Sequence, residues 1–330
     1  MYNAIILAGG KSSRMGMNTN KVLLHCAGVP LINYLTEELQ KSIADNIILV
    51  LGYEAEKIKN IVPKGCDFVI QKDQLGTGDA VKSAIPKLIN SGYTLIVNGD
   101  GPYLNFKAIN QLFEIAKNYD LILLTQEINT PNNFGRILRD ENENIIKIIE
   151  AKDANNLEKK IIECNSGIYV IKTNILKQYI YEIKNQNIQY EFYFTDMIEI
   201  LANKKLKVSS CTLDCDFYNS VNTLTELEIL EKKVRVDINY FWLQNCVRIF
   251  DINNTYIDKN CTIGKRVQIY PNVNLLSNSN VGENSVIEQN VIIKNCIIGK
   301  DCIIGGNSFL SNLIVKDGTK IPPLSNLQNY

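Results

Sequence analysis

Residues 4–16 read Ala4-Ile5-Ile6-Leu7-Ala8-Gly9-Gly10-Lys11-Ser12-Ser13-Arg14-Met15-Gly16. The first five residues form a short apolar run that is typical of a strand buried in a sheet. Glycines directly after such a strand let backbone N–H groups approach a bulky anion closely. Lys11, Arg14 and Lys21 add positive charge, and no acidic residue occurs in the first 36 positions. The stretch fits neither G-x-x-x-x-G-K-[ST] nor G-x-G-x-x-G. It therefore predicts either an unusual phosphate-binding loop or a surface turn with solvated charges.

The first 225 residues alternate between short β-branched runs and amphipathic stretches. This alternation is typical of a mostly parallel sheet covered by helices, an α/β fold. Ligands of such folds bind at the carboxyl ends of the strands. We predict strands at 3–8, 46–51, 67–70, 94–98, 120–124 and 167–170, and helices within 31–42, 79–90 and 106–118.

The next segment, residues 226–250, is predicted to be a linker helix. Thr223 and Glu226 resemble an N-cap with an acid in the first turn, and aliphatic residues then recur at helical spacing. We interpret Trp242 as a packing residue. The chain is therefore divided into domains 1–225, 226–250 and 251–330.

Residues 251–330 contain a short repeat. A six-residue period means one short strand and one turn per repeat, so three repeats close one coil of a β-helix. Five-residue steps follow Ile293 and Leu310, and Gly or Asp often comes after the aliphatic residue. The aliphatic positions are Ile257, Ile263, Ile269, Leu275, Val281, Ile287, Ile293, Ile298, Ile304, Leu310, Val315 and Ile321.

Composition and cysteine usage limit the partners and the compartment. The chain has 35 basic and 35 acidic residues, whereas general binders of nucleic acid or membrane surfaces carry a basic excess. We expect neither partner. The nine cysteines are odd in number and scattered, which indicates buried thiols in a reducing compartment, although Cys211 and Cys215 could form a redox pair. The N-terminus enters a strand directly and lacks the pattern of a signal peptide. We expect a cytoplasmic protein.

The run from Leu7 to Met15, followed by Lys21-Val22-Leu23, resembles the signature of the nucleotide-diphospho-sugar transferases. The resemblance implies a Rossmann-like domain in which the loop backbone at Leu7, Ala8, Gly9 and Gly10 holds the nucleotide. It also implies that Arg14 and Lys21 contact the phosphates and carry the catalysis.

Three further segments resemble the nucleotide and metal sites of one subfamily, the bacterial N-acetylglucosamine-1-phosphate uridyltransferases. Residues 71–80 resemble its uracil-reading segment, although a helix-capping loop would look similar. Residues 98–102 resemble a G-D-x-P motif whose Asp binds Mg²⁺, a place where Asp is otherwise a turn former. Residues 220–223 resemble the V-N segment whose Asn completes the metal site. The implied substrate-binding residues are Gln71, Gly76, Thr77, Asn98 (Tyr in the enzymes compared), Gly99 and Asn222, and the implied metal ligands are Asp100 and Asn222, with Asp214 and Asp216 as alternatives.

Four segments resemble the sugar site of the same subfamily. They are Phe134-Gly135-Arg136-Ile137, residues 149–154, Asn165-Ser166-Gly167-Ile168 and residues 191–196. The resemblance implies that Gly135, Glu150 and Asn165 bind N-acetylglucosamine, and that Tyr193 and Thr195 line its pocket.

The resemblance spans residues 4–222 and implies a Mg²⁺-dependent reaction of UTP with N-acetylglucosamine 1-phosphate, giving UDP-N-acetylglucosamine and pyrophosphate. It also implies that the β-helix is left-handed and could support a homotrimer. The subfamily's longer β-helix acetylates glucosamine 1-phosphate with a His base, but no histidine follows His25 here, so we expect no acetyltransferase activity. The alternatives are a nucleotidyltransferase for glucose 1-phosphate with UTP or dTTP, and a catalytically silent nucleotide-sugar-binding protein.

Overall fold

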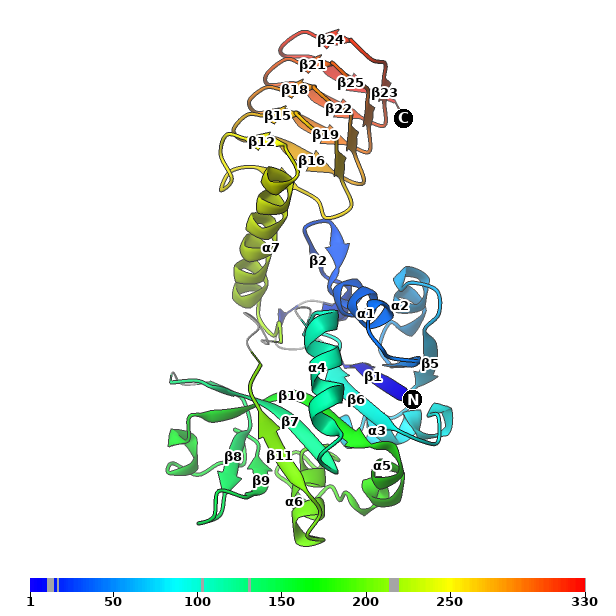
Figure 1. The fold of residues 1–330 in the computed structure, drawn as a ribbon, viewed down its shortest axis with the longest axis vertical. Helices are drawn as coiled ribbons and strands as arrows, with labels where there is room; N and C mark the ends of the chain where they lie inside the picture. Colours follow the sequence, from blue (N-terminus) through cyan, green and yellow to red (C-terminus); the bar gives the residue numbers. More distant parts are fainter. Residues whose placement is uncertain (11–14, 17, 102–103, 130–131, 214–219, 330) are drawn as a thin grey trace. The chain divides into compact units, whose positions relative to one another are not determined.

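The computed structural model describes residues 1–10, 15–16, 18–101, 104–129, 132–213 and 220–329. The chain divides into two compact units (Figure 1). The first consists of residues 1–23 and 31–222, and the second of residues 24–30 and 223–330. The domain boundaries predicted from the sequence place residues 24–30 in the first domain, whereas these residues pack as part of the second unit.

The first unit is built on a mixed sheet in the order β11-β7-β10-β6-β1-β4-β5. The central strands are parallel: β1 pairs with β4 and β6, and β4 pairs with β5. β10 runs antiparallel to both β6 and β7, and a hairpin, β8–β9, is attached to β10. The strands are β1 (Tyr2–Ala8), β4 (Asn46–Leu51), β5 (Asp67–Ile70), β6 (Tyr93–Asn98), β7 (Leu121–Glu127), β8 (Arg136–Arg139), β9 (Ile145–Ile149), β10 (Glu163–Lys172) and β11 (Val208–Cys211).

Helices cover both faces of this sheet because alternate residues of each strand point to opposite sides. Ala4 and Ile6 of β1 belong to a core with α1, α2 and α4, whereas Ile5 belongs to a second core with α3, α5 and α6. The helices are α1 (Leu31–Lys41), α2 (Ala55–Ile61), α3 (Thr77–Ala84), α4 (Phe106–Ala116), α5 (Thr173–Tyr179) and α6 (Asp196–Asn203), and the 3₁₀ turns are η2 (Lys21–Leu23), η3 (Ile85–Lys87), η4 (Glu158–Lys160) and η5 (Ile180–Glu182).

The sequence-based prediction of a helix at 79–90 had the wrong limits. The helix begins at Thr77, and its regular part ends at Ala84 because Pro86 cannot donate a backbone hydrogen bond. Residues 85–87 form a 3₁₀ turn instead.

The second unit contains the helix α7 (Leu224–Gln244) and a left-handed β-helix. Thr223 caps α7 through a capping box with Glu226, and Trp242 packs against the core of the β-helix. The sequence predicts this N-cap but places the helix at 226–250, whereas it ends at Gln244 and Arg248–Ile249 form a strand. A hairpin of β2 (His25–Cys26) and β3 (Val29–Pro30) also belongs to this unit.

The strands of the β-helix form three stacks of parallel pairs in the part of the chain that the structure describes (Figure 1). All twelve aliphatic residues of the predicted repeat are buried, which confirms the repeat. The strand register changes from 18 residues per coil (Asn274 beside Ile292) to 17 (Asn280 beside Ile297), as the five-residue steps require. The strands are β12 (Arg248–Ile249), β13 (Tyr256–Ile257), β14 (Thr262–Ile263), β15 (Gln268–Ile269), β16 (Asn274–Leu276), β17 (Asn280–Val281), β18 (Val286–Ile287), β19 (Ile292–Lys294), β20 (Ile297–Ile298), β21 (Ile303–Ile304), β22 (Phe309–Ser311), β23 (Ile314–Val315), β24 (Lys320–Ile321) and β25 (Asn326–Gln328).

Asparagines at the corners explain how so short a repeat can turn. Asn272, Asn290 and Asn307 all have positive φ, a conformation that Asn tolerates better than most residues. Their side chains form a ladder: the Asn272 amide donates to Asn290 at 3.0 Å, and the Asn290 amide donates to Asn307 at 2.9 Å. The Asn-rich composition of the tail therefore has a structural role.

Two bulk properties of the chain follow from the structure. No helix among the described residues is both long and apolar enough to cross a membrane. The eight cysteines that the structure describes are free thiols, five of them buried, and Cys246 is exposed. Cys215 lies outside the described residues.

Candidate active site

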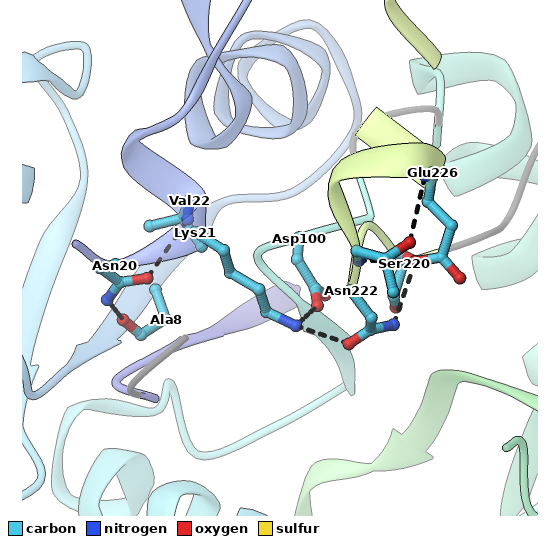
Figure 2. A network of polar contacts seen from close by, with 9 residues as sticks. Ala8, Asn20, Lys21, Val22, Asp100, Ser220, Asn222 and Glu226 are labelled. Atoms are coloured by element: carbon cyan, nitrogen blue, oxygen red, sulfur yellow. Dashed lines mark hydrogen bonds and ion pairs between the residues drawn. The ribbon is translucent and has the colours of Figure 1, made fainter. Parts of the chain in front are cut away.

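Lys21, Asp100 and Asn222 converge at the carboxyl ends of β1 and β6 (Figure 2). The ammonium of Lys21 forms an ion pair with Oδ2 of Asp100 and donates to Oδ1 of Asn222 at 2.9 Å. The backbone N–H of Val221 donates to the carbonyl of Asp100 at 3.0 Å, so the chain before α7 is attached beside the end of β6. Lys21 and Asn222, which are 201 positions apart in the sequence, thus belong to one polar cluster.

The loop that carries Lys21 is fixed by Asn20, a residue that the sequence analysis did not single out. Asn20 is buried, and its amide donates to the carbonyl of Ala8 at 2.9 Å and to that of Tyr53 at 3.2 Å. Its backbone N–H donates to the carboxylate of Glu54 at 2.7 Å, and its side-chain oxygen accepts from Val22 N–H at 3.2 Å. Asn20 therefore holds the 3₁₀ turn that begins at Lys21 against the end of β1. A buried Asn directly before a candidate catalytic Lys could have been suspected, but its partners lie too far along the chain to be inferred.

One oxygen of the Asp100 carboxylate receives no hydrogen bond from the described residues. Asp100 is 5% exposed, and its Oδ1 is buried without a hydrogen-bond partner. Buried carboxylate oxygens are normally paired, and an unpaired one costs about 1–3 kcal/mol. With the amide oxygen of Asn222, the carboxylate forms an oxygen-only donor set of the kind that Mg²⁺ prefers, with remaining positions left for water and substrate phosphates. Within the described ranges, no cluster of three or more His, Cys, Asp or Glu side chains could hold a metal. The unpartnered Oδ1 of Asp100 and the nearby amide oxygen of Asn222 are compatible with Mg²⁺ shared with a substrate.

The glycine-rich loop lies beside the candidate base-reading segment. A Cβ on Gly9 would lie 3.1 Å from Oε1 of Gln71, and one on Gly10 would meet no described atom within 4 Å. The Gln71 amide donates to the carbonyl of Gly76 at 3.0 Å and to Asp79 at 2.8 Å, which closes the turn before α3. The oxygen of Gln71 thus faces the loop while its nitrogen holds the turn.

Gly76 and Thr77 join this turn to the candidate sugar segment. Gly76 has a φ of 117°, and a Cβ there would lie 2.5 Å from the carbonyl oxygen of Phe192, so only glycine fits. The hydroxyl of Thr77 accepts from Phe194 N–H at 2.9 Å. Residues 71–79 and 191–196, predicted to read the base and the sugar respectively, are therefore neighbours.

A second cluster contains the residues predicted to bind the sugar. The Thr195 hydroxyl donates to Oε1 of Glu150 at 3.1 Å, and a Cβ on Gly135 would lie 3.6 Å from the same carboxylate oxygen. The backbone N–H of Asn165 donates to the carbonyl of Gly135 at 2.9 Å. The Asn165 side-chain amide donates to the hydroxyl of Tyr169 at 2.6 Å, which fixes its orientation. Four of the five predicted sugar residues thus adjoin one another.

This second cluster is acidic. Burial raises the pKa of Glu150, and the hydrogen bond from Thr195 opposes the rise. Burial, followed by repulsion from Glu199 and Glu150, raises the pKa of Asp196 to about 6. Burial and the nearby Asp153 and Glu191 carboxylates raise the pKa of Tyr193. Carboxylates in this number suit hydroxyl and amide donors of an uncharged sugar ring and disfavour a phosphate.

The remaining predicted residues lie near the first cluster or outside the described ranges. The carbonyl of Leu7 accepts from Gly99 N–H at 2.9 Å, so β1 and β6 are joined directly at their carboxyl ends. Asn98 lies against Gly167, where an added Cβ would be 2.8 Å from its side-chain nitrogen. Arg14, Asp214 and Asp216 lie outside the described residues.

Comparison with known proteins relates the first unit to one family and to several solved structures. Residues 4–146 match the family described as the MobA-like NTP transferase domain. The structure of a UDP-glucose pyrophosphorylase complexed with UDP-glucose is similar, with a TM-score of 0.61 at 17% identity over 74% of this chain and 99% of that one. HddC from Yersinia pseudotuberculosis has a TM-score of 0.55 at 23% identity, over 71% of this chain and 100% of that one. At these identities the structures show the fold alone. The first unit therefore has a Rossmann-like fold, and residues 4–146 within it are similar to an NTP transferase domain.

Two curated proteins are similar to this chain over a longer stretch and at higher sequence identity. The bifunctional protein GlmU of Lactococcus lactis subsp. lactis (strain IL1403) is 40% identical over 268 residues, which cover 79% of this chain and 58% of the relative. The bifunctional protein GlmU of Clostridioides difficile (strain 630) is 35% identical over 266 residues, which cover 80% of this chain and 58% of the relative. The chain therefore resembles the bifunctional GlmU proteins, spanning 58% of the length of each of these two relatives, which confirms the resemblance inferred from its motifs.

Proposed function

We propose that this protein transfers UMP from UTP to N-acetylglucosamine 1-phosphate, giving UDP-N-acetylglucosamine and pyrophosphate. The observation that carries the proposal is the convergence of Lys21, Asp100 and Asn222 at the carboxyl end of the sheet. The similarity to GlmU proteins over four fifths of the chain supports it. We also propose that Asp100 and Asn222 hold Mg²⁺, which would supply positive charge to phosphate oxygens when bound.

The reaction requires mainly that the two substrates are positioned correctly and that their negative charge is neutralised. A sugar phosphate is already ionised at neutral pH, so its attack on the α-phosphorus of UTP needs no general base. The nucleophilic oxygen forms a bond to phosphorus as the bond to the leaving pyrophosphate breaks, and negative charge accumulates on the leaving group. Lys21 is suited to that charge because its side chain is long and 24% exposed, so its ammonium can move from its protein partners to a phosphate oxygen. Arg14 has the same proposed role.

The Lys21 cluster and the Glu150 cluster differ in charge, and this difference indicates which part of the substrates each one binds. The first cluster pairs the Lys21 ammonium with the single carboxylate of Asp100, whereas the Glu150 region carries several carboxylates. We propose that the phosphates lie at the first and the N-acetylglucosamine ring at the second, with Gln71 and Thr77 beside the base. Glucose 1-phosphate with UTP or dTTP is the alternative pair of substrates.

One assay distinguishes these functions. Pyrophosphate release by the full chain would be measured with UTP or dTTP, each combined with N-acetylglucosamine 1-phosphate or glucose 1-phosphate, with and without Mg²⁺. We expect the highest kcat/KM for UTP with N-acetylglucosamine 1-phosphate and Mg²⁺. A higher value for glucose 1-phosphate would contradict the sugar assignment. Binding of UTP without turnover of any pair would support the silent binding protein.

Three further expectations remain proposals. The lack of acetyltransferase activity would be refuted if the pure chain acetylated glucosamine 1-phosphate with acetyl-CoA. A homotrimer through the β-helix is testable by analytical ultracentrifugation of the full chain. A cytoplasmic location is supported by the free thiols, because disulfides are rare in reducing compartments.

A further inference from the structure

The hairpin of residues 24–30 joins the two units in an unusual way. It lies between Lys21–Leu23 and α1 in the sequence, yet it packs as part of the second unit. At the other end of the first unit, α7 of the second unit is capped by Thr223, the residue directly after Asn222. The two residues that meet at the candidate active site, Lys21 and Asn222, are therefore each followed within three residues by chain that belongs to the second unit.

Specific contacts within the second unit hold the hairpin. Its turn residues Ala27 and Gly28 have φ values of 43° and 77°, and positive φ at both central residues is what the favoured two-residue hairpin turn requires. The carbonyl of Ala27 accepts from Lys259 N–H at 2.9 Å. A Cβ on Gly28 would lie 2.5 and 2.7 Å from the two carboxylate oxygens of Asp258. A non-glycine residue such as Ala27 keeps a positive φ only where its surroundings fix it, and here the first coil of the β-helix does so.

The same coil is attached to α7. The Arg235 guanidinium of α7 lies 3.9 Å from the centre of the Tyr256 ring, and Glu231 forms an ion pair with Arg235 at 2.7 Å. The amide of Asn239 donates to the carbonyls of Ile252 and Thr255 at 2.8 and 2.9 Å. The hairpin and α7 are thus both held by residues 252–259.

We infer that the contact of the hairpin with Asp258 and Lys259 positions Lys21 and Asn222 for the reaction. The chain from Lys21 through the hairpin, the first coil and α7 to Asn222 is closed into a loop by hydrogen bonds, one of them the Lys21–Asn222 bond itself. Loosening any part of this loop increases the freedom of both ends, and small errors in placing a catalytic group reduce turnover strongly. Gly28, whose missing Cβ lets the hairpin approach the first coil, is therefore a positioning residue, a role that rests on the proposed function.

The test uses Gly28→Ala in the full chain, with Gly318→Ala as the matched control. Gly318 is in the same unit and has a φ of 70°, but an added Cβ would meet no described atom within 4 Å. For Gly28→Ala we expect kcat for pyrophosphate release to fall by about tenfold or more with saturating substrates, and KM values to change much less. Gly318→Ala should keep kcat near wild type. Adding Asp258→Ala to Gly28→Ala removes the clashing atoms and should restore most of the lost kcat.

Hydrogen exchange gives a readout that does not depend on activity. In the unsubstituted chain, the amides of Val22 and Val221 are hydrogen-bonded to Asn20 and Asp100. We expect faster exchange at these two amides in Gly28→Ala and unchanged exchange in β4. In the unsubstituted chain under mildly denaturing urea, we expect the exchange of the Lys259 amide to become faster at the same urea concentration as that of the Val22 and Val221 amides.

Unchanged exchange and unchanged kcat in Gly28→Ala would overturn the inference. So would opening of the Lys259 amide in urea without faster exchange at Val22 and Val221, a result that can be obtained even if Gly28→Ala does not fold. If the unsubstituted chain released no pyrophosphate from any substrate pair, the proposed function would fail, while the exchange results would still decide whether the hairpin holds the two segments.

Discussion

Replacing Asp100 by Asn should separate activity from stability. The substitution keeps the shape of the side chain and removes its charge. If Asp100 helps to hold Mg²⁺ beside the phosphates, its removal takes away transition-state charge stabilisation worth about 2.7–4 kcal/mol, equivalent to about 10²–10³ in rate. We therefore expect kcat/KM for pyrophosphate release to fall by about a hundredfold or more.

The folded state should be much less affected, because two effects oppose each other. Asp100→Asn loses an ion pair to Lys21, but the Lys21 side chain is 24% exposed and keeps its hydrogen bond to Asn222, so its charge is not left buried without a partner. It also removes a buried charge whose Oδ1 has no partner among the described residues, and the desolvation of that oxygen already costs about 1–3 kcal/mol. The free energy of unfolding should therefore change by no more than about 1 kcal/mol in either direction, as urea titration would measure.

The matched control is Asp67→Asn, which breaks the exposed Lys87–Asp67 pair at 3.2 Å. This variant should keep both activity and stability. The reasoning would be refuted if Asp100→Asn retained more than about a third of the wild-type kcat/KM, or if its loss of activity accompanied a loss of stability of more than about 3 kcal/mol.

Three other perturbations test separate parts of the structure. Asn20→Ala removes the side chain that holds the Lys21 turn to Ala8. We expect the unfolding free energy to fall by about 1–3 kcal/mol and kcat to fall at least about tenfold. Asn20→Asp should not fully restore either value, because it lacks the amide donor. The folded-state pKa of Asp196, about 6, lies above its ordinary value of 3.8, so its contribution to stability is present below about pH 4 and lost as pH rises to about 6. Asp196→Asn should therefore be more stable than wild type at about pH 8 and equally stable at about pH 4. The pKa shift corresponds to about 3 kcal/mol, which solvent screening reduces to about 1 kcal/mol. A gain in stability at both pH values would show that the ionisation of Asp196 is not its cause. Gly282→Ala places a Cβ 2.5 Å from the backbone of the next coil at Gly299 and should lower the melting temperature, whereas a melting temperature equal to that of wild type would show that the coils can separate without cost.

The features predictable from the sequence are those with a period or a local motif. Six strands of the sheet in the first unit and the ladder of the β-helix follow from apolar patterns in the sequence, and both are confirmed. Short elements such as β8, β11 and α2 were missed because their patterns span only four to seven residues.

Interactions between residues far apart in the chain were harder to predict from the sequence. The meeting of Asp100 with Asn222 was inferred through resemblance rather than from the residues themselves. Neither the bonds of Asn20 to Tyr53 and Glu54 nor the packing of the hairpin on Asp258 leaves a local signature, because each partner taken alone is an ordinary polar residue. The catalytic and binding roles of the site residues stay predictions until the variants are measured.

The hairpin at residues 24–30 also has a consequence for biosynthesis. Its partner Lys259 is translated 232 residues after Ala27, which at about 5–20 residues per second is a delay of about 10–50 seconds. The hairpin therefore leaves the ribosome well before the surface that binds it has been made. Much of the first unit can therefore fold while its Lys21 turn is still joined to an undocked hairpin. If docking completes the site, enzymatic competence is acquired only after the first β-helical coil has emerged.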